Sequence, residues 1–290
     1  MPSIRQIRGR LRSIHSTKQI MRAMQLVSAS KLKRSQTRLM EARSTLDFLD
    51  GLLQRVLAST SGLQHPLTAV NEEPSPMLVV FTSDAGLCGS YNTNLIQLAE
   101  STLRQDGRKP YQLVHIGKKG HRYFTKRGYA AVESYLDLAG RPNLGKAGTI
   151  GRALMERFLA GTVSSVSLLY SEFASSMVYR PTVVRWLPIA LERGTADAKK
   201  PVQAAEEYIF EPSPQRVFED LLPRWALATF QRMMLESFTS EHSARMIAMK
   251  NATDNAEELL KSLTMLRNKI RQASITKELS EIVGTAEALK

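Results

Sequence analysis

The 290-residue sequence contains a single cysteine, Cys88. One thiol excludes an intramolecular disulfide and any metal site that needs several thiolates. Long apolar runs are also missing, since the longest, such as residues 77–81, are far shorter than the roughly 18 residues that a membrane-spanning helix requires. We therefore expect a chain that does not span a membrane.

Acidic residues are absent from the first 40 positions, which contain ten Lys or Arg. The whole chain carries a net charge of +13 against +10 in this segment, so the remaining 250 residues contribute only +3. This local charge predicts an acidic partner: nucleic acid, an anionic membrane face or an acidic protein surface. An Arg-rich, acid-poor start is also typical of transit peptides, but here a helical repeat runs through it without a break.

Aromatic residues are absent from positions 1–47. A basic coiled coil that binds nucleic acid is an alternative function, but proteins that hold single strands use aromatic side chains to stack on the bases. The absence of aromatics therefore argues against it. An α/β enzyme with helical arms is a second alternative, which turnover by the isolated chain would support.

A heptad repeat occupies the N-terminal segment. Ser3 and Gln6 form the S-x-x-Q pattern of a capping box at a helix start. Steps of three and four residues from position 4 to position 56 then reach 12 apolar side chains among 16 positions. A repeat of this length predicts a coiled-coil helix over 1–57. Its polar exceptions, which weaken pairing but can fix the register, are Lys18, Gln25, Ser28 and Ser35.

The middle of the chain has a different period. Residues 58–76 are rich in Ser, Thr and Pro and predict a linker. Strand-like apolar runs alternate with helical stretches over 77–192, which predicts a three-layer, Rossmann-like α/β domain with a mainly parallel sheet. A connector and foot segment follows over 193–212. The strand-like runs are 77–84, 111–117, 164–173 and 181–189.

A second heptad repeat ends the chain and predicts a coiled-coil helix over 213–290, in which Pro223 is a possible kink site. The predicted fold class is therefore α/β, with the α/β domain inserted in a long antiparallel coiled coil of the N- and C-terminal helices. Antiparallel pairing that starts with residue 56 beside 214 puts residue 1 beside about 270 and leaves the last ~20 residues without a partner in this chain.

That overhang carries an apolar stripe of Ile275, Leu279, Ile282, Val283 and Leu289. Soluble proteins seldom leave such a stripe bare, so we expect another protein to enclose it. A tip that folds back on its own domain is the alternative, but Gly284 is the only glycine available for the turn.

Motifs for chemistry are incomplete. The segment GRPNLGKA (140–147) has Ala147 where a phosphate-binding P-loop needs Ser or Thr, and GLCG lacks the third glycine of a dinucleotide-binding loop. Cys88 has no neighbouring His to activate it, and the histidines show no metal-ligand spacing. Asp84 is interpreted as a turn or cap residue and Glu257 and Glu258 as solvated. We predict no catalytic residue, no cofactor and no metal.

Three long segments resemble the gamma subunits of rotary F-type ATP synthases. They are IRGRLRSIHSTKQIMRAMQLVSASKLKRSQ, FTSDAGLCGSYNTNL and SARMIAMKNATDNAEELLKSLTMLRNKIRQASITKELSEIVGTAEAL. The resemblance implies a non-catalytic rotor shaft, present as one copy, on the cytoplasmic face of the bacterial inner membrane. Its implied partners are the hexamer of alpha and beta subunits, the epsilon subunit and the membrane c-ring, with no nucleic acid.

The resemblance also implies which residues make contacts. Those that would face the hexamer are Met24, Arg271, Gln272, Thr276, Glu278 and Glu281, and those of the foot near the ring and epsilon are Tyr208, Phe210 and Glu211. A basic shaft face of Arg8, Arg12, Arg34 and Arg38 would meet acidic loops of the hexamer. The sequence departs from the family pattern at Met21, Gln25, Ala85 and Arg267. With Cys88 alone, the redox switch of the chloroplast branch is not expected.

Overall fold

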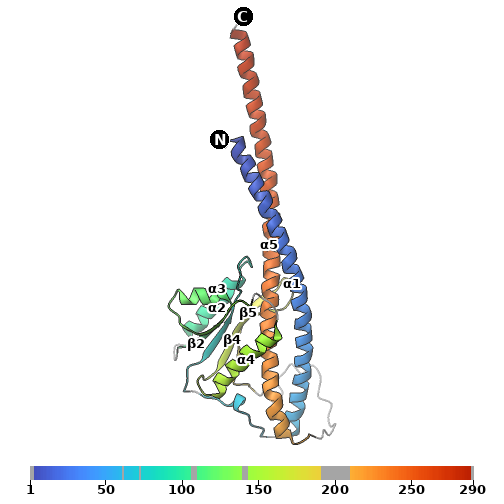
Figure 1. Ribbon diagram of the computed structural model, residues 1–290, viewed down its shortest axis with the longest axis vertical. Helices are drawn as coiled ribbons and strands as arrows, with labels where there is room; N and C mark the ends of the chain where they lie inside the picture. Colours follow the sequence, from blue (N-terminus) through green and yellow to red (C-terminus); the bar gives the residue numbers. More distant parts are fainter. Residues whose placement is uncertain are drawn as a thin grey trace. The chain divides into compact units, whose positions relative to one another are not determined.

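The computed structural model describes residues 3–60, 62–71, 73–105, 110–138, 143–190 and 210–288 (Figure 1). Its elements are α1 (Ile4–Ser59), η1 (Pro66–Thr68), β1 (Met77–Phe81), α2 (Tyr91–Gln105), β2 (Gln112–Ile116), α3 (Lys118–Thr125), β3 (Ala131–Tyr135), α4 (Leu144–Leu159), β4 (Val166–Phe173), β5 (Tyr179–Leu187) and α5 (Pro214–Ala288). They form two compact units, which we call the coil unit (Met1–Ala29 with Arg245–Lys290) and the α/β unit (Ser30–Ala244). Both long helices contribute to both units.

The sheet of the α/β unit has the strand order β3-β2-β1-β4-β5. β1 pairs in parallel with β2 and β4, β2 pairs in parallel with β3, and β5 is antiparallel to β4. The order reverses at β1, which is the doubly wound arrangement. Every residue of β1 is buried, and this explains its continuous apolar run, since a central parallel strand is covered on both faces.

Helices cover both faces of this sheet (Figure 1). Leu78, Val80 and Leu113 pack with residues of α2 and α3 in one core cluster. The second cluster joins the other face to α4 and to the α1 and α5 segments of this unit. There Trp186 donates its Nε1–H to the Ala226 carbonyl at 2.9 Å and its ring contacts Phe230. The α1 and α5 segments of the α/β unit thus form one layer of the domain itself.

The predicted architecture is confirmed, with one strand missed. The four strand-like runs correspond to β1, β2, β4 and β5. β3 was not predicted, because it lies at a sheet edge and its Val132 and Ser134 are exposed, so that no apolar run marks it. α5 continues through Pro223. The division into five segments drawn from the sequence stays a prediction.

The predicted register of the two long helices is wrong by about one helical turn. Pairing of residue 56 with 214 would put Ser35 beside about 235 and Lys18 beside about 252. Instead, Ser35 Oγ lies 2.7 Å from Thr239 Oγ1 in the α/β unit, and Lys18 binds Glu257 in the coil unit. An apolar heptad repeat looks alike at successive turns, so polar partners decide the register.

Candidate functional site

The C-terminal tip of α5 is exposed along the described part of its apolar stripe. In the coil unit α5 extends beyond the start of α1 (Figure 1). Ile275 is 49% exposed, Leu279 57% and Ile282 65%, and these positions share one helix face because they are four and three residues apart. The exposure expected from the sequence is confirmed for the described part of the tip, and Leu289 lies outside the described residues.

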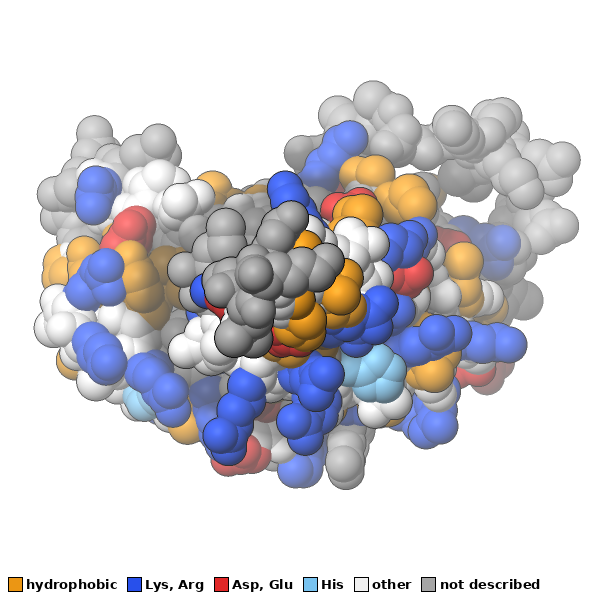
Figure 2. Space-filling view, turned by 90° about the horizontal axis from the view of Figure 1, so that it is seen from above, with side chains coloured by type: hydrophobic (Ala, Val, Ile, Leu, Met, Phe, Trp, Pro, Cys, Tyr) orange, Lys and Arg blue, Asp and Glu red, His pale blue; other side chains and the backbone are white. Residues whose placement is uncertain are grey.

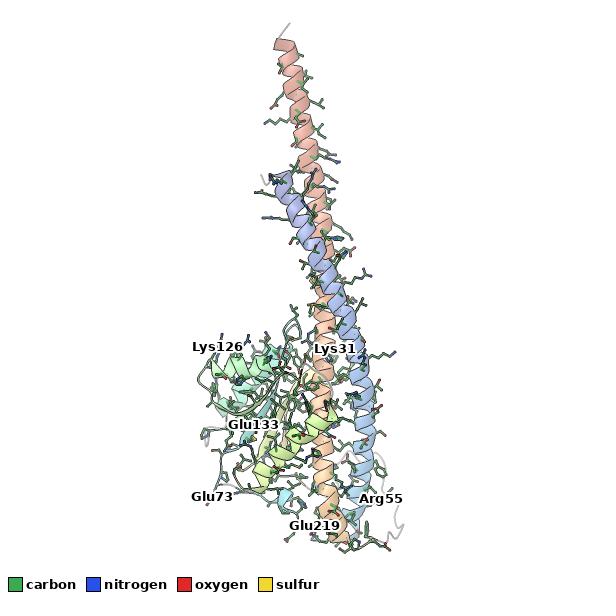
Figure 3. All side chains as sticks on the ribbon, in the orientation of Figure 1. Lys31, Arg55, Glu73, Lys126, Glu133 and Glu219 are labelled. Carbon is green, nitrogen blue, oxygen red and sulfur yellow. The ribbon has the colours of Figure 1, made fainter. Side chains whose placement is uncertain are left out.

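Polar residues surround this stripe. All five contact positions implied on the tip, which are Arg271, Gln272, Thr276, Glu278 and Glu281, are exposed. Lys277 forms an i, i+4 ion pair of 3.6 Å with Glu281. Figure 3 shows side chains projecting from several sides of these last turns. The tip therefore has a mixed apolar and charged surface that a partner protein can enclose.

Met24, which the resemblance also implies as a hexamer contact, lies in the coil unit and is half-buried. Its carbonyl accepts a hydrogen bond of 2.7 Å from the hydroxyl of Ser28, which is buried. Arg8 and Arg12 of this unit are exposed, and so are Arg34 and Arg38 of the α/β unit. Many Lys and Arg side chains and few Asp and Glu side chains cover the face drawn in Figure 2.

Lys18 explains one polar exception in the heptad. Its Nζ donates to Glu257 Oε2 at 3.0 Å, and the two side chains are 23% and 49% exposed. The hydrogen bond and the charge of Lys18 lower the pKa of Glu257. Glu257 and Glu258 are both exposed, as expected from the sequence, and Glu257 in addition pairs with Lys18.

The foot residues are only partly described. Phe210 is half-buried and packs against the core cluster that contains α4 and α5. Glu211 is exposed. Tyr208 lies outside the described residues.

At the carboxyl end of β1, polar side chains bind the chain's own backbone. Asp84, after β1, accepts hydrogen bonds from the backbone N–H of Lys118 at 3.1 Å and of Asp137 at 3.2 Å. This confirms its role as a turn residue. The Ser83 backbone N–H donates to Asn92 Oδ1 at 3.0 Å, and Cys88 is buried beside them. Rossmann-like domains bind ligands at this edge, and here Asp84 and Asn92 use their oxygens to accept hydrogen bonds from the chain's own backbone.

The described part of the GRPNLGKA segment (140–147) belongs to the start of α4. Asn143 caps the start of α4 by accepting a hydrogen bond of 3.1 Å from the Lys146 backbone N–H. Residues 140–142 of that motif lie outside the described residues. Across the part of the chain that the structure describes, no group of three or more His, Cys, Asp or Glu is placed to hold a metal ion. No helix within those same residues is long and apolar enough to cross a membrane.

His115 is a buried titratable group of the α/β unit without a hydrogen-bond partner. It is fully buried in β2, its ring stacks on Phe124 with centroids 5.3 Å apart, and neither ring nitrogen has a hydrogen-bond partner. Burial, and next the neighbouring His121, lower the pKa of His115 to about 4. The ring is therefore neutral at pH 7, and it forms part of the core rather than a ligand set.

Sequence reasoning missed a buried polar stretch of α5. Five of its polar residues are each at most 1% exposed: Glu236, Ser237, Thr239, Ser240 and Ser243. A polar stretch on a helix usually indicates a solvated face, so only the contacts of the folded chain could reveal it.

The chain is similar to known proteins over nearly its whole length. The protein-family model described as ATP synthase matches residues 3–289. The ATP synthase gamma chain of Pelotomaculum thermopropionicum is 40% identical to this chain and that of Moorella thermoacetica 41%, each over 290 residues and 100% of both proteins.

Solved structures agree in fold. A chain of the Euglena gracilis mitochondrial ATP synthase (OSCP/F1/c-ring, rotational state 3) superposes with a TM-score of 0.68 at 18% identity, covering 99% of this chain and 94% of its own. A chain of the Tetrahymena thermophila mitochondrial ATP synthase (central stalk/c-ring) gives a TM-score of 0.61 at 24% identity, covering 80% and 99%. None of these similarities supports the alternative of a nucleic-acid-binding coiled coil.

Proposed function

The chain belongs to the ATP synthase gamma-chain family, and we propose that it is the central rotor shaft of an F-type ATP synthase. It couples ion-driven rotation of the membrane c-ring to ATP synthesis and hydrolysis in the alpha-beta hexamer. The single observation that carries this proposal is the exposed apolar tip of α5, since a bare stripe of this kind needs an enclosing partner.

The tip supplies the bearing. Ile275, Leu279 and Ile282 lie in the apolar sleeve of the hexamer, while Arg271, Gln272, Thr276, Glu278 and Glu281 contact its polar rim, together with Met24 lower on the coil. The basic shaft face of Arg8, Arg12, Arg34 and Arg38 meets acidic loops of the hexamer. Because the shaft is asymmetric, each rotation presents a different face to each catalytic subunit in turn.

The foot supplies the other coupling. Tyr208, Phe210 and Glu211 contact the c-ring and the epsilon subunit, and one copy of the chain serves each complex. We propose that the subunit is non-catalytic and needs no cofactor, which agrees with the turn contacts of Asp84 and the burial of Cys88. The complex places the chain as a peripheral subunit on the cytoplasmic face of the bacterial inner membrane.

Reconstitution tests the proposal. The chain is mixed with the alpha and beta subunits of its own organism, the complex is isolated, and ATP hydrolysis is measured with the full chain and with residues 275–290 removed. We expect one copy per hexamer and a cooperative turnover that changes when the tip is lost. A chain that stays separate and leaves turnover unchanged would refute the shaft.

A further inference from the structure

In the α/β unit, one short stretch of α5 is buried on all sides although it is polar. It runs from Glu236 to Ser243 and includes Ser237, Thr239 and Ser240, none of which is more than 1% exposed. Burying polar groups is costly unless they find partners. The partners of this stretch, which we call the polar seam, therefore identify what it holds together.

The first set of partners lies on α1. Thr239 Oγ1 and Ser35 Oγ are 2.7 Å apart, and both residues are fully buried. One turn away along α5, Glu236 Oε1 accepts a hydrogen bond of 3.0 Å from Arg43 Nη2. These contacts join the two long helices by directional bonds at two successive levels.

The second set lies on the α/β domain. Ser240 Oγ donates to the Ser171 carbonyl of β4 at 3.1 Å, and Ser243 Oγ donates to the Ser176 carbonyl in the β4–β5 turn. The same turn reaches α1, because Gln36 Nε2 donates to Ser176 Oγ at 3.2 Å. The β4–β5 hairpin is therefore bonded to both helices.

An ion cluster around the buried carboxylate of Glu236 connects α1, α5 and the β4–β5 hairpin. Arg43 Nη2, from α1, donates at 3.0 Å to Glu236 Oε1 of α5 and at 3.0 Å to the Phe173 carbonyl at the end of β4. Arg232 Nη1 donates to the same Glu236 oxygen at 3.0 Å. Glu236 is 1% exposed, and both guanidinium groups bind the same oxygen of its carboxylate.

Stability alone does not require such a seam. Apolar residues of similar volume often replace buried ion pairs without loss of stability, and apolar contacts are non-directional. Two helices that pack only by apolar ridges can shift by a turn and find similar contacts. A shift at the polar seam instead leaves buried hydroxyls and charges unpaired, so the seam resists sliding and rolling.

We propose that the polar seam, together with Arg43 of α1, is the joint through which torque passes between the α1 and α5 segments of the α/β unit and its sheet. Arg43 and Glu236 are positioning residues for the proposed shaft, on which this inference rests. They keep α1, α5 and the β4–β5 hairpin in one register when the shaft is loaded.

The test uses the complete complex of hexamer, shaft and ring, with a magnetic bead on the ring to measure the unloaded rotation rate and the stall torque. The variant is Arg43→Met with Glu236→Gln, which keeps side-chain volume and removes the ion pair. We expect an unchanged unloaded rate and roughly a twofold or larger loss of stall torque, because the unsupported register slips under load. A disulfide from Ser35→Cys with Thr239→Cys in the same variant restores the torque.

The matched control is Arg157→Met with Glu133→Gln. This ion pair of 3.2 Å lies inside the α/β domain, between α4 and β3, where Figure 3 labels Glu133. We expect this control variant to keep the wild-type stall torque. An equal loss in this control, an unchanged torque in the seam variant, or a loss that the disulfide does not restore would each overturn the joint.

A second measurement applies if the seam variant does not assemble. In the isolated chain, Ser35→Cys with Ser243→Cys reports a one-turn shift, and its disulfide forms in the seam variant but not in the wild-type background. Failure to form it overturns the proposal. A wild-type chain that transmits no torque refutes the proposed shaft and, with it, this inference. A wild-type chain that transmits torque, together with a seam variant that is unaffected, refutes the joint alone.

Discussion

Lys18 on α1 and Glu257 on α5 form an ion pair of 3.0 Å across 239 positions of sequence. The pair sets the register in the coil unit, where both helices otherwise repeat apolar contacts. Because both side chains are partly exposed, the pair contributes modestly to stability and is screened by salt.

A charge swap tests this pair. Lys18→Glu alone puts two carboxylates together and lowers the thermal midpoint at low salt, and Lys18→Glu with Glu257→Lys restores it. Calorimetry at low and high ionic strength measures both effects, and the difference shrinks as salt rises. A double variant as unstable as the single one would contradict the pairing.

Gly117, which follows β2, is predicted to tolerate no side chain. Its φ is +102°, and a Cβ there would overlap the backbone carbonyl of Thr82. We expect Gly117→Ala to cost more than about 3 kcal/mol, since backbone strain alone costs about 1–3 and the clash adds to it. Urea unfolding followed by tryptophan fluorescence measures the loss.

The matched control for Gly117 is Gly128→Ala. Gly128 also has a positive φ, of +81°, but open space where its Cβ would lie. It should lose only about 1–2 kcal/mol. Equal losses at the two glycines would show that the Thr82 contact does not matter.

His115 predicts a pH dependence. Its pKa is about 4 in the folded chain and 6.5 when unfolded, so below pH 6.5 the unfolded state binds the extra proton. The stability of the α/β unit therefore falls as pH drops from 6.5 to 4, by roughly 3 kcal/mol in total. Above pH 6.5 this contribution is constant.

His115→Leu removes that part of the acid sensitivity, whereas His15→Leu, at an exposed position of α1, keeps it. Thermal midpoints between pH 4 and pH 8 measure the difference. A His115→Leu curve that runs parallel to the wild type would show that the buried ring does not control acid stability.

The basic shaft face predicts salt-dependent assembly. Arg8, Arg12, Arg34 and Arg38 are exposed, so charge reversal by Glu should leave the isolated chain folded. It should weaken binding to the hexamer most at low ionic strength, because salt screens attraction between exposed charges. Binding affinities measured at several salt concentrations decide this, and an affinity that charge reversal does not alter at any of them would remove the electrostatic role.

Local sequence patterns predicted most of the helices and strands. The S-x-x-Q cap is present, with Ser3 N–H donating to Gln6 Oε1 at 3.0 Å and Gln6 N–H donating to Ser3 Oγ at 3.3 Å. The heptads became α1 and α5, and the apolar runs became buried strands. These features depend on neighbours three or four positions away, or on alternation within a few residues, and the sequence contains that information directly.

By itself the sequence determined the long helices, the inserted α/β domain, the local positive charge and the bare apolar tip. The tertiary structure alone decided the register, the edge strand β3 and the polar seam around Glu236. The physical reason is that these depend on pairs such as Ser35 with Thr239 and Arg43 with Glu236, far apart in the chain. A polar side chain on a helix is compatible with solvent or with a buried partner, and only the folded contacts choose between them.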